Sequence, residues 1–285
     1  LAPLQDIAVK QRPGFRRHTL QGINLFVLEM FRQFPTILGV NLYNYFPDDS
    51  NGLPNAIQGS HDLARHDTAT VAIRGVVRTD TTLSVAVTVT NLAGHKLPSG
   101  VGFRRVFLTL QVIDAQTNTV IWSSGRTNAL GILVNERGRP LPSEFFEGQG
   151  DNQAYQPHHQ IIRSQDQVQI YEELVKDPQG QFTTSFIARA TEIKDNRLLP
   201  KGWSTAGPAA TDTTPHGTVC QDPDYPCTHG GKEGVATGQD TTTYEVPLEA
   251  LGGKDLHTLR LEVGLHYQSL PPYYLQQRFT TQRGV

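Results

Sequence analysis

The sequence predicts a mainly β protein, in which an immunoglobulin-like β-sandwich follows an N-terminal helical segment. From residue 68 onward, apolar residues alternate with Thr, Ser and Ala in short runs, which is the period of strands with one buried face. Turn-forming residues are plentiful, with 26 Gly and 18 Pro among 285 residues. Long irregular stretches at 126–160, 191–218 and 219–240 interrupt the strands. We therefore expect a sandwich with long loops, which are often functional or pack on a partner.

Residues 1–67 are the predicted N-terminal arm and helices, and residues 68–285 are the predicted sandwich domain. The first 17 residues are polar and basic and are predicted to be extended. Apolar residues at helical spacing predict a helix over 20–34, which a proline ends. Apolar side chains on its other faces predict that this helix is buried on most sides. A second, short helix is expected around 55–67.

Each strand is predicted from apolar residues at every second position and from the turns that bound it. A turn at 79–81 makes the first two strands a hairpin, and a turn at 115–117 joins the next two. A later pair of strands is expected around the turn at 177–180. The expected strands cover 71–76, 83–89, 106–114, 119–122, 167–172, 182–188, 242–246 and 257–267.

Composition narrows the range of partners. The chain has 25 Lys and Arg against 27 Asp and Glu, a net charge of -2. Such a chain offers no electrostatic footprint for nucleic acid and no polybasic anchor for a membrane. The longest apolar stretch, 23–31, is too short to span a bilayer. The chain begins at Leu1 without a Met, so we expect a processed form or a segment of something longer.

Motifs for enzyme chemistry are missing from the sequence. It has no Gly-x-Ser-x-Gly elbow, no phosphate loop and no dinucleotide-binding fingerprint. His61 and His66 are five residues apart, which does not give the i, i+4 chelate of a metalloprotease helix. His158 and His159 are adjacent, so on a strand they face opposite sides. We expect no catalysis by this chain.

Both cysteines, Cys220 and Cys227, lie in one loop rich in Pro and Gly. A local disulfide that staples this loop is the simpler interpretation, and disulfides persist in oxidising compartments. A zinc site that adds His216 and His229 is the alternative, although the spacing matches no familiar zinc pattern.

Five segments, in order along the chain, resemble the C-terminal part of many multihaem c-type cytochromes. Gly94-His95-Lys96-Leu97-Pro98-Ser99-Gly100 resembles their GHKLPTG motif, and Lys194-Asp195-Asn196-Arg197-Leu198-Leu199-Pro200 resembles their KDNR-x-x-P motif. The segments 18–24, 167–172 and 267–274 are similar to further stretches of that family. Order and rough spacing agree from residue 18 to about 275. From the residues alone, each motif is also interpretable as a corner of the sandwich.

The resemblance implies the haem-free β-domain of a periplasmic or extracellular electron-transport system. Covalent attachment of haem c needs a C-x-x-C-H segment, and this sequence contains none. Haem c is therefore expected on an upstream segment or on a partner subunit, within a larger protein complex. This chain would support or dock those haems without doing bond chemistry itself.

Four residues are the candidates for contact with haem under this resemblance. His18 occupies the position of a family histidine and is predicted as a distal haem ligand, with His95 as a second candidate. Arg104 and Arg105 form a basic pair that is predicted to meet a haem propionate.

Two other classes of function stay open at the level of the sequence. A secreted binding or structural module would use its long loops to recognise a glycan or a protein in a surface assembly. A metal-dependent enzyme would use His158, His159 or the loop at 216–229. A partner chain with several C-x-x-C-H motifs distinguishes the cytochrome hypothesis from both.

Overall fold

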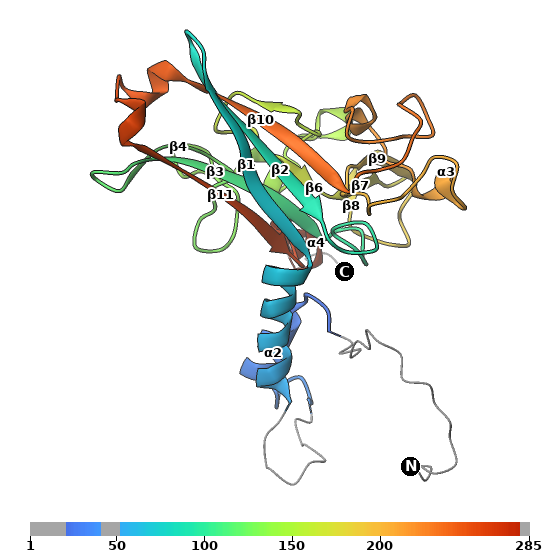
Figure 1. The fold of residues 1–285 in the computed structure, drawn as a ribbon. Coiled ribbons are helices and arrows are strands. Elements are labelled where there is room, and N and C mark those ends of the chain that lie inside the picture. The colour runs from blue at the N-terminus through green and yellow to red at the C-terminus, as the bar shows by residue number, and fades with distance from the viewer. Residues whose placement is uncertain (1–20, 41–51, 280–285) are drawn as a thin grey trace, which may run out of the picture.

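The computed structural model describes residues 21–40 and 52–279 of the chain. Two β-sheets pack face to face, which confirms the predicted mainly β fold, and a third, small sheet lies beside them (Figure 1). The strands are β1 (Ala69–Arg78), β2 (Thr82–Asn91), β3 (Arg105–Asp114), β4 (Thr119–Ser124), β5 (Ile161–Ile162), β6 (Ile170–Tyr171), β7 (Glu173–Lys176), β8 (Phe182–Thr183), β9 (Thr191–Asp195), β10 (Gln239–Pro247) and β11 (Leu259–Gln268). The α-helices are α1 (Leu25–Gln33), α2 (Leu53–Asp62), α3 (Ala210–Thr213) and α4 (Pro272–Phe279).

The first sheet has the strand order β1-β2-β10-β5. β1 and β2 form the predicted hairpin, and the Thr79 hydroxyl oxygen accepts a hydrogen bond from the Thr82 N–H at 2.9 Å in its turn. Every second residue of β2 from Leu83 to Val89 is buried in the core. This alternation is the signal from which the sequence predicts the strand.

The second sheet has the order β11-β3-β4, and β6 pairs with β3 as well. β3 is buried on both faces. Leu108 and Leu110 pack into the main core between the sheets, while Phe107 packs on the other face with Leu133 and Leu141. The long stretch 126–160 therefore contributes to packing, because it covers the outer face of the second sheet.

The third sheet has the order β8-β7-β9 and corrects the predicted strand pair. Residues 167–172 do not pair with 182–188; instead β6 pairs with β3, and β7 begins directly after it and pairs with β8. β9 lies in a stretch that the sequence predicts as a loop, because its residues Thr-Glu-Ile-Lys-Asp show little apolar alternation. Packing against β7 makes this charged segment a strand.

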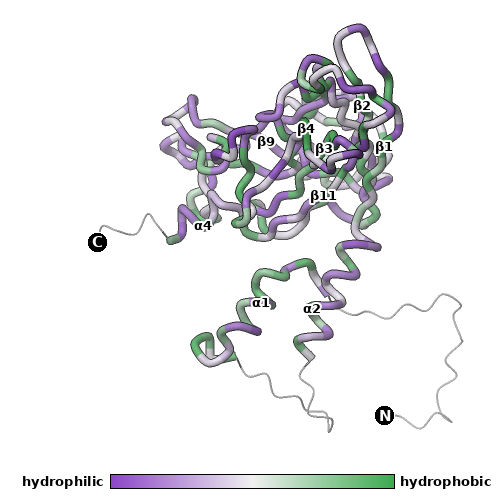
Figure 2. Tube along the Cα trace, turned by 90° about the vertical axis from the view of Figure 1, so that its left-hand side faces the viewer, coloured by the Kyte–Doolittle hydropathy of each residue, from purple (hydrophilic) through white to green (hydrophobic). Residues whose placement is uncertain are grey.

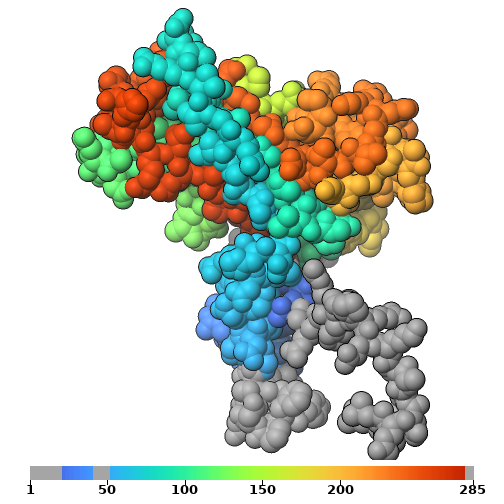
Figure 3. All heavy atoms as spheres, viewed as in Figure 1, coloured from blue at the N-terminus to red at the C-terminus, as the bar shows by residue number. Residues whose placement is uncertain are grey.

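The helices α1 and α2, with the π-helix η1 (Leu63–Asp67), project from one end of the sandwich (Figures 1 and 3). We call them the helical arm. The prediction that the first helix is buried on most sides is wrong, because α1 has no buried residue and packs mainly on α2. Hydrophobic segments of the arm are visible apart from the sandwich in Figure 2. In the described ranges, no helix has both the length and the apolar character needed to cross a membrane.

Helix changes to strand where the two parts of the chain are predicted to meet. η1 ends at Asp67, and β1 begins at Ala69. That residues 1–67 and 68–285 are separate units stays a prediction.

Candidate functional site

The two motifs at 94–100 and 194–200 lie against each other at one corner of the sandwich, which we call the motif junction. Leu97 and Leu198 pair through two backbone N–H···O hydrogen bonds, each 2.9 Å long. The Asn91 side-chain amide donates to the carbonyl oxygens of His95 at 2.8 Å and Leu198 at 3.1 Å. The two motifs therefore hold one corner of the fold together.

Charged side chains of the motif junction are paired with one another. The buried Asp195 carboxylate accepts hydrogen bonds from Arg197 Nη2 at 2.7 Å and Lys96 Nζ at 2.5 Å. Burial would raise the pKa of Asp195, but these two cations outweigh it and lower that pKa. Lys194 Nζ is also buried and donates to Glu172 Oε1 at 3.0 Å. Burial lowers the pKa of Lys194, and the Glu172 carboxylate opposes this shift.

Next to the junction, His158 lies in a buried cluster with two aspartates. His158 Nε2 is 3.0 Å from Asp222 Oδ2 and 4.0 Å from Asp240 Oδ1. Asp240 Oδ1 is buried and has no hydrogen-bond partner among the residues described. One imidazole and two carboxylates at this spacing are a donor set to be tested for a divalent cation.

The tautomer of His158 argues against a metal in this cluster. Its Nδ1 atom faces two amide donors, Gln169 Nε2 at 2.9 Å and Asn196 Nδ2 at 3.1 Å. The Gln169 amide cannot be reversed, because its Oε1 accepts from the His159 N–H, and the Glu172 N–H holds the Asn196 amide in the same way. Nδ1 is therefore an acceptor and the proton lies on Nε2. A metal-binding histidine has the opposite arrangement, so His158 does not fit a metal ligand.

His159 faces different partners from His158, as expected for adjacent residues. Its Nε2 atom is 2.9 Å from Gln156 Oε1. Burial, with smaller contributions from Lys194 and His158, lowers the pKa of His159 to about 4. The ring is therefore neutral at neutral pH and has a structural role.

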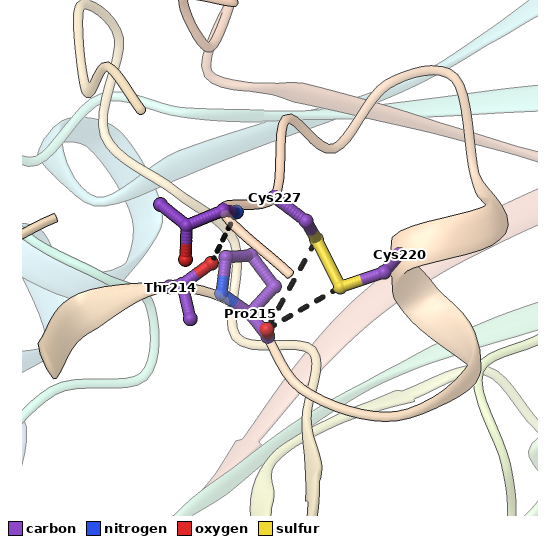
Figure 4. The surroundings of a disulfide bond; sticks show 5 residues. Thr214, Pro215, Cys220 and Cys227 are labelled. Carbon is purple, nitrogen blue, oxygen red and sulfur yellow. Dashed lines mark hydrogen bonds between the residues drawn. A yellow bond between two sulfur atoms is a disulfide. The ribbon is translucent and has the colours of Figure 1, made fainter. Parts of the chain in front are cut away.

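Cys220 and Cys227 form a disulfide, which confirms the predicted bond (Figure 4). The Thr228 N–H donates to Thr214 Oγ1 at 3.0 Å beside it, and Pro215 lies against the two sulfur atoms. The zinc alternative at this loop is wrong, because a disulfide leaves no thiolate to bind zinc. The closed loop carries Asp222 into the cluster around His158.

Of the predicted haem contacts, His18 lies outside the described residues. His95 is exposed, and its Nδ1 atom is 2.9 Å from the Lys96 carbonyl oxygen. Arg104 donates to the Ser99 carbonyl oxygen at 3.1 Å, so it closes the turn of the first motif. Among the described residues, no hydrogen bond or ion pair joins His95 to Arg104 or Arg105.

The prediction that Arg105 contacts a haem propionate is wrong. Its side chain is 1% exposed and forms two hydrogen bonds of 2.7 Å with the Glu144 carboxylate. Gln268 Oε1 accepts a third hydrogen bond from Arg105 Nε at 2.7 Å. A guanidinium that is buried and paired in this way is not available to an external carboxylate.

An open cleft lies between the helical arm and the sandwich, which we call the arm cleft. Its volume is about 570 Å³. Its lining includes Leu25, His61, Arg65, Val71, Leu97 and His266. The sequence does not reveal this site. Its one local pattern is the five-residue spacing of His61 and His66, which does not fit a metal chelate. Leu97 connects the cleft to the motif junction.

No protein-family model and no curated protein matches the chain. Among solved structures, the chain is similar to a penta-heme cytochrome c552 from Thermochromatium tepidum, with 15% sequence identity and a TM-score of 0.41. The match covers 78% of this chain and 36% of that chain, so this chain spans little more than a third of that protein. A TM-score this low assigns neither a shared fold nor a shared function.

Proposed function

We propose that this chain is a non-catalytic β-sandwich module of an extracytoplasmic electron-transfer system, which docks and supports haems carried by another segment or subunit. The observation that carries the proposal is the helical arm, which keeps large apolar side chains exposed. The resemblance of the two motifs to multihaem cytochromes supports the choice of partner.

Apolar side chains on α1 and on the turn after it supply the docking surface. Phe26 is 43% exposed, Phe34 is 48% exposed and Ile37 is 83% exposed. Leu38 is exposed as well. Large apolar side chains that gather on one projecting element mark surfaces that bind another protein. The helical arm is therefore the part of the chain that we assign to the haem-bearing partner.

The cysteines of this chain support the proposal that its partner, and not this module, attaches the haems. Haem c is attached through thiols, and the sequence holds two cysteines, both in the disulfide. The thiols that hold a haem c must therefore come from another segment or subunit. The disulfide also supports a periplasmic or extracellular location, because such bonds persist in oxidising compartments.

The proposal is tested by purifying the tagged chain from its own cells and examining what accompanies it. We expect a haem-staining partner with several C-x-x-C-H motifs and a Soret band of histidine-ligated haem. The double variant Phe34→Asp, Ile37→Asp is expected to weaken retention of that partner at least roughly tenfold, because charges replace buried apolar contacts. His18→Ala is expected to shift the Soret band if His18 is a distal ligand.

Val77→Asp is the matched control for the arm variants. Val77 is also an exposed apolar residue, but it lies near the tip of the β1–β2 hairpin, away from the helical arm (Figure 1). Partner retention is expected to be unchanged in this variant. A colourless, monomeric preparation without a haem-bearing chain would contradict the proposal and favour a secreted module that recognises a glycan or another protein.

A further inference from the structure

Two polar side chains, His61 and Arg65, line the arm cleft. Neither the His61 ring nor the Arg65 guanidinium forms a hydrogen bond or an ion pair with any residue that the structure describes. Arg105, which is buried, and Arg197, which is partly buried, are by contrast paired with carboxylates. Within the described ranges, no hydrogen bond or ion pair occupies the imidazole or the guanidinium, although Glu29 lies near enough to His61 for the histidine to lower the pKa of Glu29.

The rest of the cleft is lined largely by apolar groups from three elements. Leu25 comes from α1, Val71 from β1 and Leu265 from β11. His266 also borders the cleft from β11, but its ring stacks on Phe107, on the outer face of the second sheet, with centroids 5.2 Å apart. The cleft therefore suits a ligand with a broad apolar body.

Arg65 lies on the π-helix η1, which connects α2 to β1 and starts two residues after His61. Single π-turns are frequent at functional sites, because the wider turn changes the direction of the side chains that follow it. Here that turn occurs where the arm joins the sandwich, and both His61 and Arg65 line the space between them.

These groups together match the chemistry of a haem. A neutral imidazole is an axial ligand of haem iron, a guanidinium pairs with a propionate carboxylate, and apolar walls cover the ring. We infer that the arm cleft receives one haem of the docked partner, with His61 as an axial ligand and Arg65 at a propionate. The inference rests on the proposed function. When bound, the haem would supply a one-electron redox centre.

A fatty acid or another apolar carboxylate is the competing ligand, and whether binding depends on His61 distinguishes it from haem. Such a ligand would use Arg65 and the apolar walls but would have no need of the His61 imidazole. A loss of binding that depends on His61 therefore indicates iron ligation.

The experiment is a titration of hemin into the purified full chain, followed by absorbance and electron paramagnetic resonance. We expect a shifted Soret band and a histidine-ligated iron signal. His61→Ala is expected to remove that signal and to weaken hemin affinity roughly tenfold or more. Ala64→Trp, which places a large side chain in the cleft, is expected to block hemin as well.

His66→Ala is the matched control, because His66 is exposed on the same π-helix but does not line the cleft. Hemin binding that is unchanged in both His61→Ala and Ala64→Trp, or equally reduced in His66→Ala, would overturn the inference. Circular dichroism of each variant shows whether it is folded.

Failure of this inference is distinguishable from failure of the proposed function. Retention of the haem-bearing partner depends on Phe34 and Ile37, whereas the iron signal depends on His61. A partner that is retained with the same spectrum in His61→Ala would leave the docking function standing and reject the ligand role of His61.

Discussion

The motif junction and the arm cleft share Leu97 but differ in how their polar side chains are bonded. At the junction, Asp195 and Lys194 are buried and each is bound by an oppositely charged side chain. In the cleft, His61 and Arg65 face open space and bind no described residue. The junction is therefore a structural corner of the fold, and the arm cleft is where we propose that a ligand binds.

Free energy explains why both arrangements exist in one chain. A charge that is buried and unpaired is very costly, so the junction must satisfy each group internally. A half-exposed imidazole or an exposed guanidinium keeps its water and costs little, so it stays available for a partner. The comparison predicts that variants at the junction change stability and variants in the cleft change binding.

The largest effect is expected at the buried ion pair of the junction. Lys194→Met would leave the Glu172 carboxylate buried without its cation, since the remaining side-chain contact is the Tyr273 hydroxyl at 3.3 Å. We expect a loss of about 3–5 kcal/mol in the free energy of unfolding, measured with urea. Adding Glu172→Gln should restore part of that loss. A loss below about 1 kcal/mol would show that the pair is not buried in solution.

A smaller effect is expected from the pH dependence of stability, through His159. Its pKa is about 4 in the folded protein against an ordinary value of 6.5, so the unfolded chain takes up the proton first as the pH falls. The full contribution is present above pH 6.5 and is lost as the pH falls through about 4, with a total of roughly 3 kcal/mol. His159→Gln should reduce the slope of the free energy of unfolding with pH, measured with urea, between pH 6.5 and 5.

Exposed His257→Gln is the control for this titration, because it removes a histidine without touching the buried cluster. The slope with pH should be the same in this variant as in the original chain. Equal slopes in the His159 and His257 variants would contradict the burial of His159.

The smallest effect on stability is expected in the arm cleft. His61→Ala and Arg65→Ala remove no hydrogen bond or ion pair to a described residue, so each should change the free energy of unfolding by less than about 0.5 kcal/mol. Thermal and urea unfolding measure this directly. A loss of 1.5 kcal/mol or more would mean that these side chains stabilise the arm, and the contrast with the junction would disappear.

The strands were predictable to the extent that their burial alternates. The β1–β2 hairpin, β3, β4, β10 and β11 lie where the alternation and the turns place them. The short charged strand β9 was not predictable, because only its pairing with β7 makes it a strand. The sequence did not predict α4, which begins at the second of two consecutive prolines and has no strong helical pattern.

The prediction that the first helix is buried was the clearest error, and this error is relevant to function. The apolar residues of α1 predict a core helix, yet the structure places none of them in the core. Amphipathic spacing reports that a helix has an apolar face, but it does not report whether the chain itself or another molecule covers that face.

By itself, the sequence determined the mainly β fold and the lack of a C-x-x-C-H segment, and it favoured a local disulfide over a zinc site, because these follow from spacing, period and composition. Only the tertiary structure decided that Arg105 is buried against Glu144, that His158 has the wrong tautomer for a metal, and that His61 and His266 share a cleft. Each of these depends on residues that are far apart in the chain. No local pattern encodes which of them the fold brings within reach of one another.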